Sequence, residues 1–133
     1  MKTYVGKDIE VSYDAVRCRH AAECLRGLPS VFDVSRRPWI EPDGAGAEEL
    51  AAVIRRCPTG ALHYRLADGP PEEPVAPTRV RLPAGGPVLI AGDLEIDGVR
   101  ETRAALCRCG QSQDQPFCDG SGACGDWHYE PGS

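Results

Sequence analysis

Seven cysteines are the residues of this chain whose type and spacing could do chemistry. They fall into two groups, which are Cys18, Cys24 and Cys57 in the first half and Cys107, Cys109, Cys118 and Cys124 near the end. Thiolates at such spacings bind zinc or iron, or pair as disulfides. The odd number of cysteines and the lack of an apolar leader argue against disulfides, so we expect metal sites and a cytoplasmic location.

The composition excludes two other classes of protein. The formal net charge is −5 and basic residues occur at most in pairs, so we expect no nucleic-acid partner. No apolar run approaches the length of a membrane helix, so we expect no membrane association. With 15 glycines and 12 prolines, a chain of 133 residues has little apolar core, and bound metal would supply the missing stability.

A proline-rich segment divides the chain. Residues 67–79 hold four prolines and no apolar periodicity, which is typical of an extended linker. We therefore predict a first domain at residues 1–66 and a second domain at residues 80–133, each with its own cysteine group. The nearby charges at Glu72 and Glu73, and His63 before them, read as ordinary solvated side chains.

The first half is predicted to be a small α+β domain. The apolar residues Leu50, Val53 and Ile54 share one helix face with Cys57, which would direct that thiol toward the core. The expected elements are strands Thr3–Val5 and Ile9–Tyr13, a helix over Ala21–Arg26, a hairpin of Val31–Val34 with Trp39–Ile40, a helix over Ala47–Arg56 and a strand Leu62–Leu66.

The second half is predicted to be rich in β-structure and loops. Short strands are expected at Val80–Leu82, Val88–Ala91 and Leu94–Ile96, with a glycine–aspartate turn between the last two. After Leu106 no apolar pattern continues, so a metal would have to order this loop.

The first cysteine group has the ligands of an iron–sulfur cluster with one position changed. Cys57 is followed by Pro58, as is the last ligand in bacterial ferredoxins. The middle position of the preceding cysteine run is Ala21, which cannot ligate. Three thiolates suffice for three irons, and the neighbouring His20 is a possible fourth ligand. The alternative is that the three cysteines are small buried hydrophobes.

Residues 4–64 resemble the divergent single-cluster ferredoxin domain of bacteria. The resemblance rests on the motif around Cys18 and Cys24, on the segment from Arg37 to Ile40, and on the run that begins at Cys57 and ends at Tyr64. It implies one [3Fe-4S] or [4Fe-4S] cluster and a role in electron transfer. The spacing is also similar to that of the [3Fe-4S] ferredoxins that serve bacterial cytochromes P450.

Residues 80–129 resemble the CDGSH iron–sulfur domain, which implies a [2Fe-2S] cluster. The pattern of this family matches from Cys107 to Ser121, but its histidine ligand falls on Gly122. The fourth ligand must then come from Cys124 or from His128, or the site is incomplete. A structural site of four cysteines binding zinc is the alternative.

These features predict a cytoplasmic two-cluster iron–sulfur protein that carries single electrons and is not itself an enzyme. Its expected partner is a reductase or an oxygenase such as a cytochrome P450. Two other functions remain open. One is a redox or iron sensor, or a donor of iron–sulfur clusters, and the other is an interaction module whose fold is stabilised by bound zinc.

Overall fold

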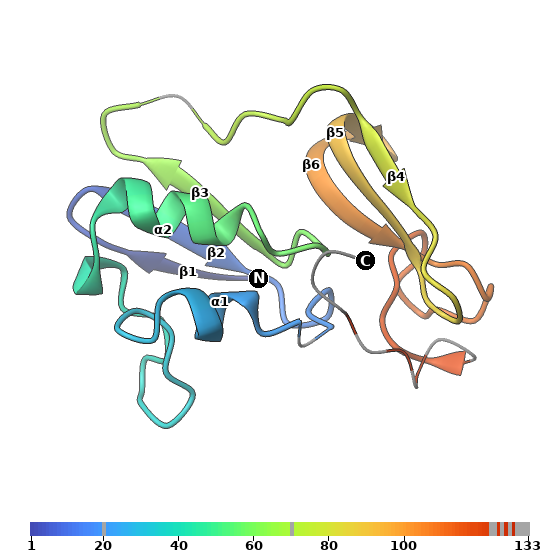
Figure 1. The fold of residues 1–133 in the computed structure, drawn as a ribbon, viewed down its shortest axis with the longest axis horizontal. Coiled ribbons are helices and arrows are strands. Elements are labelled where there is room, and N and C mark those ends of the chain that lie inside the picture. Colours follow the sequence, from blue (N-terminus) through green and yellow to red (C-terminus); the bar gives the residue numbers. More distant parts are fainter. Residues whose placement is uncertain (20, 70, 123–124, 126, 128, 130–133) are drawn as a thin grey trace.

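The computed structural model describes residues 1–19, 21–69, 71–122, 125, 127 and 129. Its framework is two three-stranded antiparallel sheets, one in each half of the chain, and the α-helices belong to the first half (Figure 1). The predicted α+β class is confirmed. Within the described part of the chain, no helix has the length and apolar character needed to cross a bilayer.

The first sheet is built from strands with alternating burial. It has the order β1 (Lys2–Val5), β2 (Ile9–Tyr13) and β3 (Leu62–Leu66), and all three strands were expected within a residue of these limits. On β2, Ile9 and Val11 are buried while Glu10 between them is exposed, because successive side chains point to opposite faces. The inner face of this sheet is therefore apolar.

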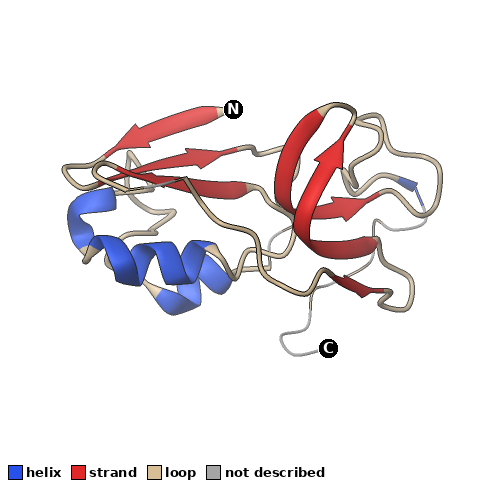
Figure 2. Cartoon of the chain, turned by 90° about the horizontal axis from the view of Figure 1, so that it is seen from above, coloured by secondary structure: helices blue, strands red, loops and turns tan. Residues whose placement is uncertain are grey.

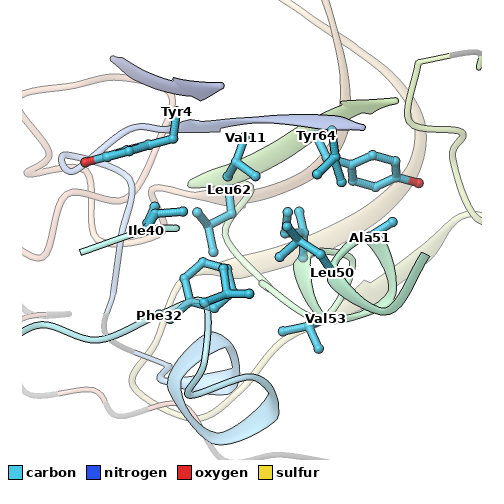
Figure 3. Packing of buried hydrophobic residues seen from close by; sticks show 12 residues of the cluster. Tyr4, Val11, Phe32, Ile40, Leu50, Ala51, Val53, Leu62 and Tyr64 are labelled. Carbon is cyan, nitrogen blue, oxygen red and sulfur yellow. The ribbon is translucent and has the colours of Figure 1, made fainter. Parts of the chain in front are cut away.

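Helices α1 (Glu23–Gly27) and α2 (Ala47–Ile54) lie on that apolar face (Figure 2). Leu50 and Ile54 from α2 are fully buried against the sheet residue Val11, and the connecting segment adds Phe32 and Ile40 to the same core (Figure 3). The cysteines Cys24 and Cys57 pack at the margin of this cluster, together with other partly buried residues. The first domain thus has a real hydrophobic core, and its thiols sit at the edge.

Both helices are shorter than the sequence indicates, and both differences occur beside cysteines. Helix α2 ends at Ile54 because the next residues close into tighter turns, with N–H of Cys57 donating to the carbonyl of Ile54 over 3.0 Å, before Pro58 ends the helical pattern. Helix α1 begins at Glu23, after Ala22 in a left-handed conformation with φ of 61°. The chain therefore turns sharply just before Cys24.

The hairpin expected between Val31 and Ile40 does not form as two strands. A single bridge joins Phe32 to Ile40, and the loop between them is held by side chains, with the Arg36 guanidinium donating to the carbonyl of Val31 over 2.7 Å. Pro38 directly precedes the expected second strand and has no N–H to donate, so the ladder cannot extend beyond Trp39. A short 3-10 helix, η1 (Pro42–Gly44), then leads to α2.

The second sheet differs more from the expectation. It contains β4 (Arg79–Arg81), β5 (Val88–Ile96) and β6 (Val99–Leu106), in that order. The two strands expected around a turn at Gly92 are one long strand, and the register shift between Ala91 and Leu94 is a bulge. Strand β6 was not predicted. It follows an Asp97–Gly98 turn with positive φ at both residues, the turn that favours two-residue hairpins.

The proline-rich segment is partly packed against the domains. Pro71 forms a bridge with Arg65, and the carboxylate side chain of Glu72 is only 5% exposed, against Arg103 of β6. After Glu72 the segment runs along one side of the molecule to the second sheet (Figure 1). Glu72 was expected to be solvated, and that expectation is wrong.

Candidate functional site

The structure brings the first three predicted cysteines to one end of the first domain. Cys18 lies in the loop after β2, Cys24 in the first turn of α1, and Cys57 directly after α2. The Tyr13 hydroxyl interacts electrostatically with all three thiols. Burial, a hydrogen bond with Cys18 and the charges of the three thiols raise the pKa of Tyr13 above its ordinary value of 10.0.

The thiols of Cys24 and Cys57 have pKa values shifted in opposite directions. Burial, followed by the charge of Cys57, raises the pKa of the Cys24 thiol to about 11. Burial also acts to raise the pKa of Cys57, but the Arg103 guanidinium and hydrogen bonds from Leu62 and Thr59 outweigh it, and this pKa lies below its usual value. Of these two thiols, Cys57 therefore carries negative charge more readily.

Three of the four cysteines in the second group lie around the end of β6. The N–H of Cys118 donates to the carbonyl of Ala105 over 2.8 Å, and the N–H of Cys107 donates to that of Pro116 over 2.7 Å. Cys118 is buried, and Cys109 packs against the small cluster that it forms with Leu89 and Ala105. The loop from residue 107 to residue 118 thus closes on itself and gathers its thiols.

Hydrogen bonds shape the turn that follows Cys118. The Asp119 carboxylate accepts from the hydroxyl of Ser121 at 2.7 Å, the N–H of Ser121 at 3.0 Å and the N–H of Gln113 at 2.9 Å. These bonds, that from the Ser121 side chain first, lower the pKa of Asp119 to about 2. Gln115 donates to the Cys107 sulfur over 3.3 Å. Asp119 therefore orders the loop and is not a free acid–base group.

The donors present are thiols, which are the ligands of iron–sulfur groups. Among the described residues, no set of three or more His, Cys, Asp or Glu side chains is placed to hold a single metal ion. The buried Nε atoms of Arg17, Arg19 and Arg103 also have no hydrogen-bond partner in the part of the chain that the structure describes. Two of these arginines flank Cys18, and an anionic group with sulfur acceptors suits such donors.

Three of the predicted ligands cannot be placed. His20, Cys124 and His128 lie outside the described residues, so the fourth ligand of each site stays a prediction.

A buried charged network that the sequence analysis missed joins the two halves. Arg103 of β6 donates to the carbonyl oxygens of Ile54 at 2.8 Å, Cys57 at 2.7 Å and Leu62 at 2.7 Å, all in the first domain. Its guanidinium also lies 2.6 Å from the Glu72 carboxylate. Both side chains of this pair are nearly inaccessible, with exposures of 6% and 5%. Arg103 is thus a direct link between the second domain and the Cys57 turn.

Arg17 is the second link of this network. Its guanidinium lies 3.0 Å from the Glu101 carboxylate and donates to the carbonyls of Thr59 and Arg103, each over 3.1 Å. Gly60 lies at this junction with φ of +72°, and a Cβ there would overlap the Arg103 carbonyl and the Arg17 guanidinium. Only glycine allows the two halves to approach this closely.

His63 was expected to be solvated, but it is part of the same network. Its Nδ1 lies 3.2 Å from Glu72 and its Nε2 lies 3.6 Å from Glu101. Burial lowers the pKa of His63, but hydrogen bonds with Glu101 and Glu72 raise it more, against the opposing charge of Arg103. Burial alone would raise the pKa of Glu72 and of Glu101. The hydrogen bond from His63 and the charge of the nearby arginine outweigh burial, so both pKa values lie below the ordinary value.

This arrangement predicts a pH-dependent stability. A raised histidine pKa adds stability that is complete below the ordinary value of 6.5 and is lost as the pH rises through the folded-state pKa. The lowered glutamate pKa values add stability above the ordinary value of 4.5. We therefore expect the free energy of unfolding to decline as the pH rises from 6.5. Urea denaturation across this range should show a smaller decline in His63→Gln, and an unchanged slope would contradict the assignment.

Comparison with known proteins agrees with the two halves of this site. Residues 4–67 match the family model described as a divergent 4Fe-4S mono-cluster, and residues 85–121 match the one described as an iron-binding zinc finger of CDGSH type. The second match ends just before Gly122, where the expected histidine is absent.

Relatives exist for the first half. The YjdI proteins of Escherichia coli K12 and O157:H7, both described as uncharacterized, are each 39% identical over 64 residues, which are 48% of this chain and 84% of theirs. No solved structure matches the chain. The chain belongs to the divergent 4Fe-4S mono-cluster family and carries a CDGSH-type iron–sulfur domain after it.

Proposed function

We propose that this protein is a cytoplasmic one-electron carrier with two iron–sulfur centres and no enzymatic activity of its own. The observation that carries the proposal is the grouping of its thiols. The described cysteines gather in two places, one at the edge of each small domain. Bound iron–sulfur groups supply reversible one-electron chemistry at such positions.

The chain's own residues have three tasks in this function. Cys18, Cys24 and Cys57 hold the first centre, which is a [3Fe-4S] cluster or a [4Fe-4S] cluster. In the four-iron form, His20 binds the fourth iron or that iron is labile. Cys107, Cys109 and Cys118 hold the second, a [2Fe-2S] cluster, with Cys124 or His128 completing it. The Arg103 guanidinium, beside Cys57, stabilises negative charge there and so favours reduction of the first centre.

A basic cavity beside the first centre supports docking of a redox partner. It has a volume of about 430 Å³, and its described lining includes Pro58, which follows Cys57, and the acid Glu23. Five arginines also line it: Arg55, Arg56, Arg79 and Arg81 are available to a partner, whereas Arg103 is paired with Glu72 and is only 6% exposed. Although the net charge is −5, this face is positive and suits an acidic reductase or oxygenase surface. A cytochrome P450 or its reductase is the class of partner we propose.

The function is tested on protein purified without oxygen. We expect iron and acid-labile sulfide in both domains, visible absorbance that bleaches on reduction, and two electron paramagnetic resonance signals. Each centre should take up one electron reversibly. A colourless protein containing zinc would support the interaction module instead. Rapid transfer of iron and sulfide to an apo-acceptor protein, with no reversible reduction, would support the cluster donor.

Docking at the basic cavity gives a separate expected result. Reduced flavodoxin, an acidic one-electron flavoprotein, should reduce the carrier more slowly as salt is added, because screening weakens the attraction. The double change Arg55→Ala and Arg56→Ala should slow the reaction several-fold at low salt. Lys2→Ala with Lys7→Ala, two basic residues outside the cavity lining, is the matched control. Equal slowing in both double variants would contradict docking at this face.

A further inference from the structure

The two cysteine loops are in direct contact through the residue before each key cysteine. Arg17 precedes Cys18, and Phe117 precedes Cys118. The Arg17 guanidinium carbon lies 4.2 Å from the centre of the Phe117 ring, a cation–π contact between the two domains. Arg17 is 7% exposed, so this contact is shielded from water. The first loop therefore faces the second, and the loop after β2 extends toward the second domain (Figure 1).

The residue after Cys18 makes a second contact between the same loops. The Arg19 guanidinium lies directly against Gly120, two residues beyond Cys118. Gly120 has φ of +84°, and a Cβ at this position would overlap the guanidinium. Glycine here serves the backbone conformation and also leaves the space that Arg19 occupies. Cys18 is thus bracketed by two arginines that both reach the Cys118 loop.

Strand β6 ties the remaining cysteines to this arrangement. Its residue Ala105 accepts a hydrogen bond from the N–H of Cys118, and two residues earlier Arg103 donates to the carbonyl of Cys57. One short stretch of strand therefore holds a cysteine turn from each domain. These bonds join buried groups, so the position of one turn relative to the other is well determined.

We propose that Arg17 and Arg19 lock the two cysteine loops face to face, so that the two centres form one unit within which an electron passes from one to the other. This rests on the proposed function. In the exchange, one electron leaves the reduced centre and is taken up by the oxidised centre, and no bond or proton is involved. The electron enters from a reduced flavoprotein and leaves to the acceptor. Arg17 and Arg19 are positioning residues for this exchange.

The locking is tested without reference to iron. A protease site is inserted between Glu73 and Thr78, in the segment beyond the buried Glu72, and the chain is cut there. We expect the halves of the cut chain to elute together in gel filtration. Arg17→Ala and Gly120→Ala should each release them, while Arg100→Ala, on the same strand but in an exposed ion pair with Asp93, should not. Separation of the cut unsubstituted chain would overturn the proposal.

The electron exchange is tested by spectroscopy of the loaded full-length chain. When both centres are paramagnetic, the resonance of the first centre should relax faster than in Cys109→Ser, which lacks the second centre. Gly120→Ala, which keeps all seven cysteines, should lose most of that enhancement and slow the redistribution of an electron between the centres. Two loaded centres with no relaxation enhancement would overturn the exchange. A chain that holds no iron would instead overturn the proposed function, so the two failures differ.

Discussion

Replacing Arg103 with alanine is expected to lower the free energy of unfolding by about 3–5 kcal/mol. The reason is that removal of one member of a buried ion pair leaves the charge of the other, here Glu72, buried without its ion-pair partner. The Glu72 side chain would be left 5% exposed without its guanidinium, and the carbonyls of Ile54, Cys57 and Leu62 would lose their donor. Urea denaturation of the loaded protein measures the change.

Arg100→Ala is the matched control for this prediction. Arg100 lies on the same strand, and its Nε is 3.3 Å from Asp93, but both side chains are 70% exposed. Exposed pairs of this kind contribute about 0–1 kcal/mol, so this variant should be close to the unsubstituted protein. If the two variants lose the same stability, the buried network does not hold the domains together.

Replacing Cys57 with serine is expected to abolish the first centre and leave the second intact. The substitution exchanges one atom for a smaller one, so the α2 turn should survive, but a hydroxyl is a poor ligand for an iron–sulfur group compared with a thiolate. The resonance and absorbance of the first centre should disappear, with a loss of three to four irons per chain by the cluster types proposed here.

Cys109→Ser is the reciprocal change and supplies the control. It should remove the [2Fe-2S] signal and keep that of the first centre, because the two cysteine groups belong to different domains. Iron and sulfide analysis beside electron paramagnetic resonance distinguishes the results. Loss of both signals in either variant would show that the cysteines are shared by one centre.

The local pattern of the chain predicts most of the first domain and misses part of the second. Alternation of apolar residues identifies β2 and β3, because a strand with one buried face repeats every two residues, and the Gly6–Lys7 turn before β2 identifies β1 as its hairpin partner. The same rule fails on β6, where the inward positions include the charged residues Glu101 and Arg103. The Asp97–Gly98 dipeptide was the signal that could have identified this hairpin.

Cysteine spacing identifies the candidate ligands because a cluster motif is local: the thiols of each loop lie a few residues apart, and the amino acids between them set the loop's shape. For this reason the cysteines of residues 18–24 and 107–118 can be assigned from the sequence without knowledge of the fold, and both resemblances agree with the family models.

The burial of Arg17, Glu72 and Arg103 has no such local signature. Arg17 meets Glu101 across 84 positions of sequence and Arg103 meets Glu72 across 31. A charged side chain is expected to be exposed to water unless the fold places a side chain of opposite charge beside it. Here the packing of the two domains against each other supplies that partner.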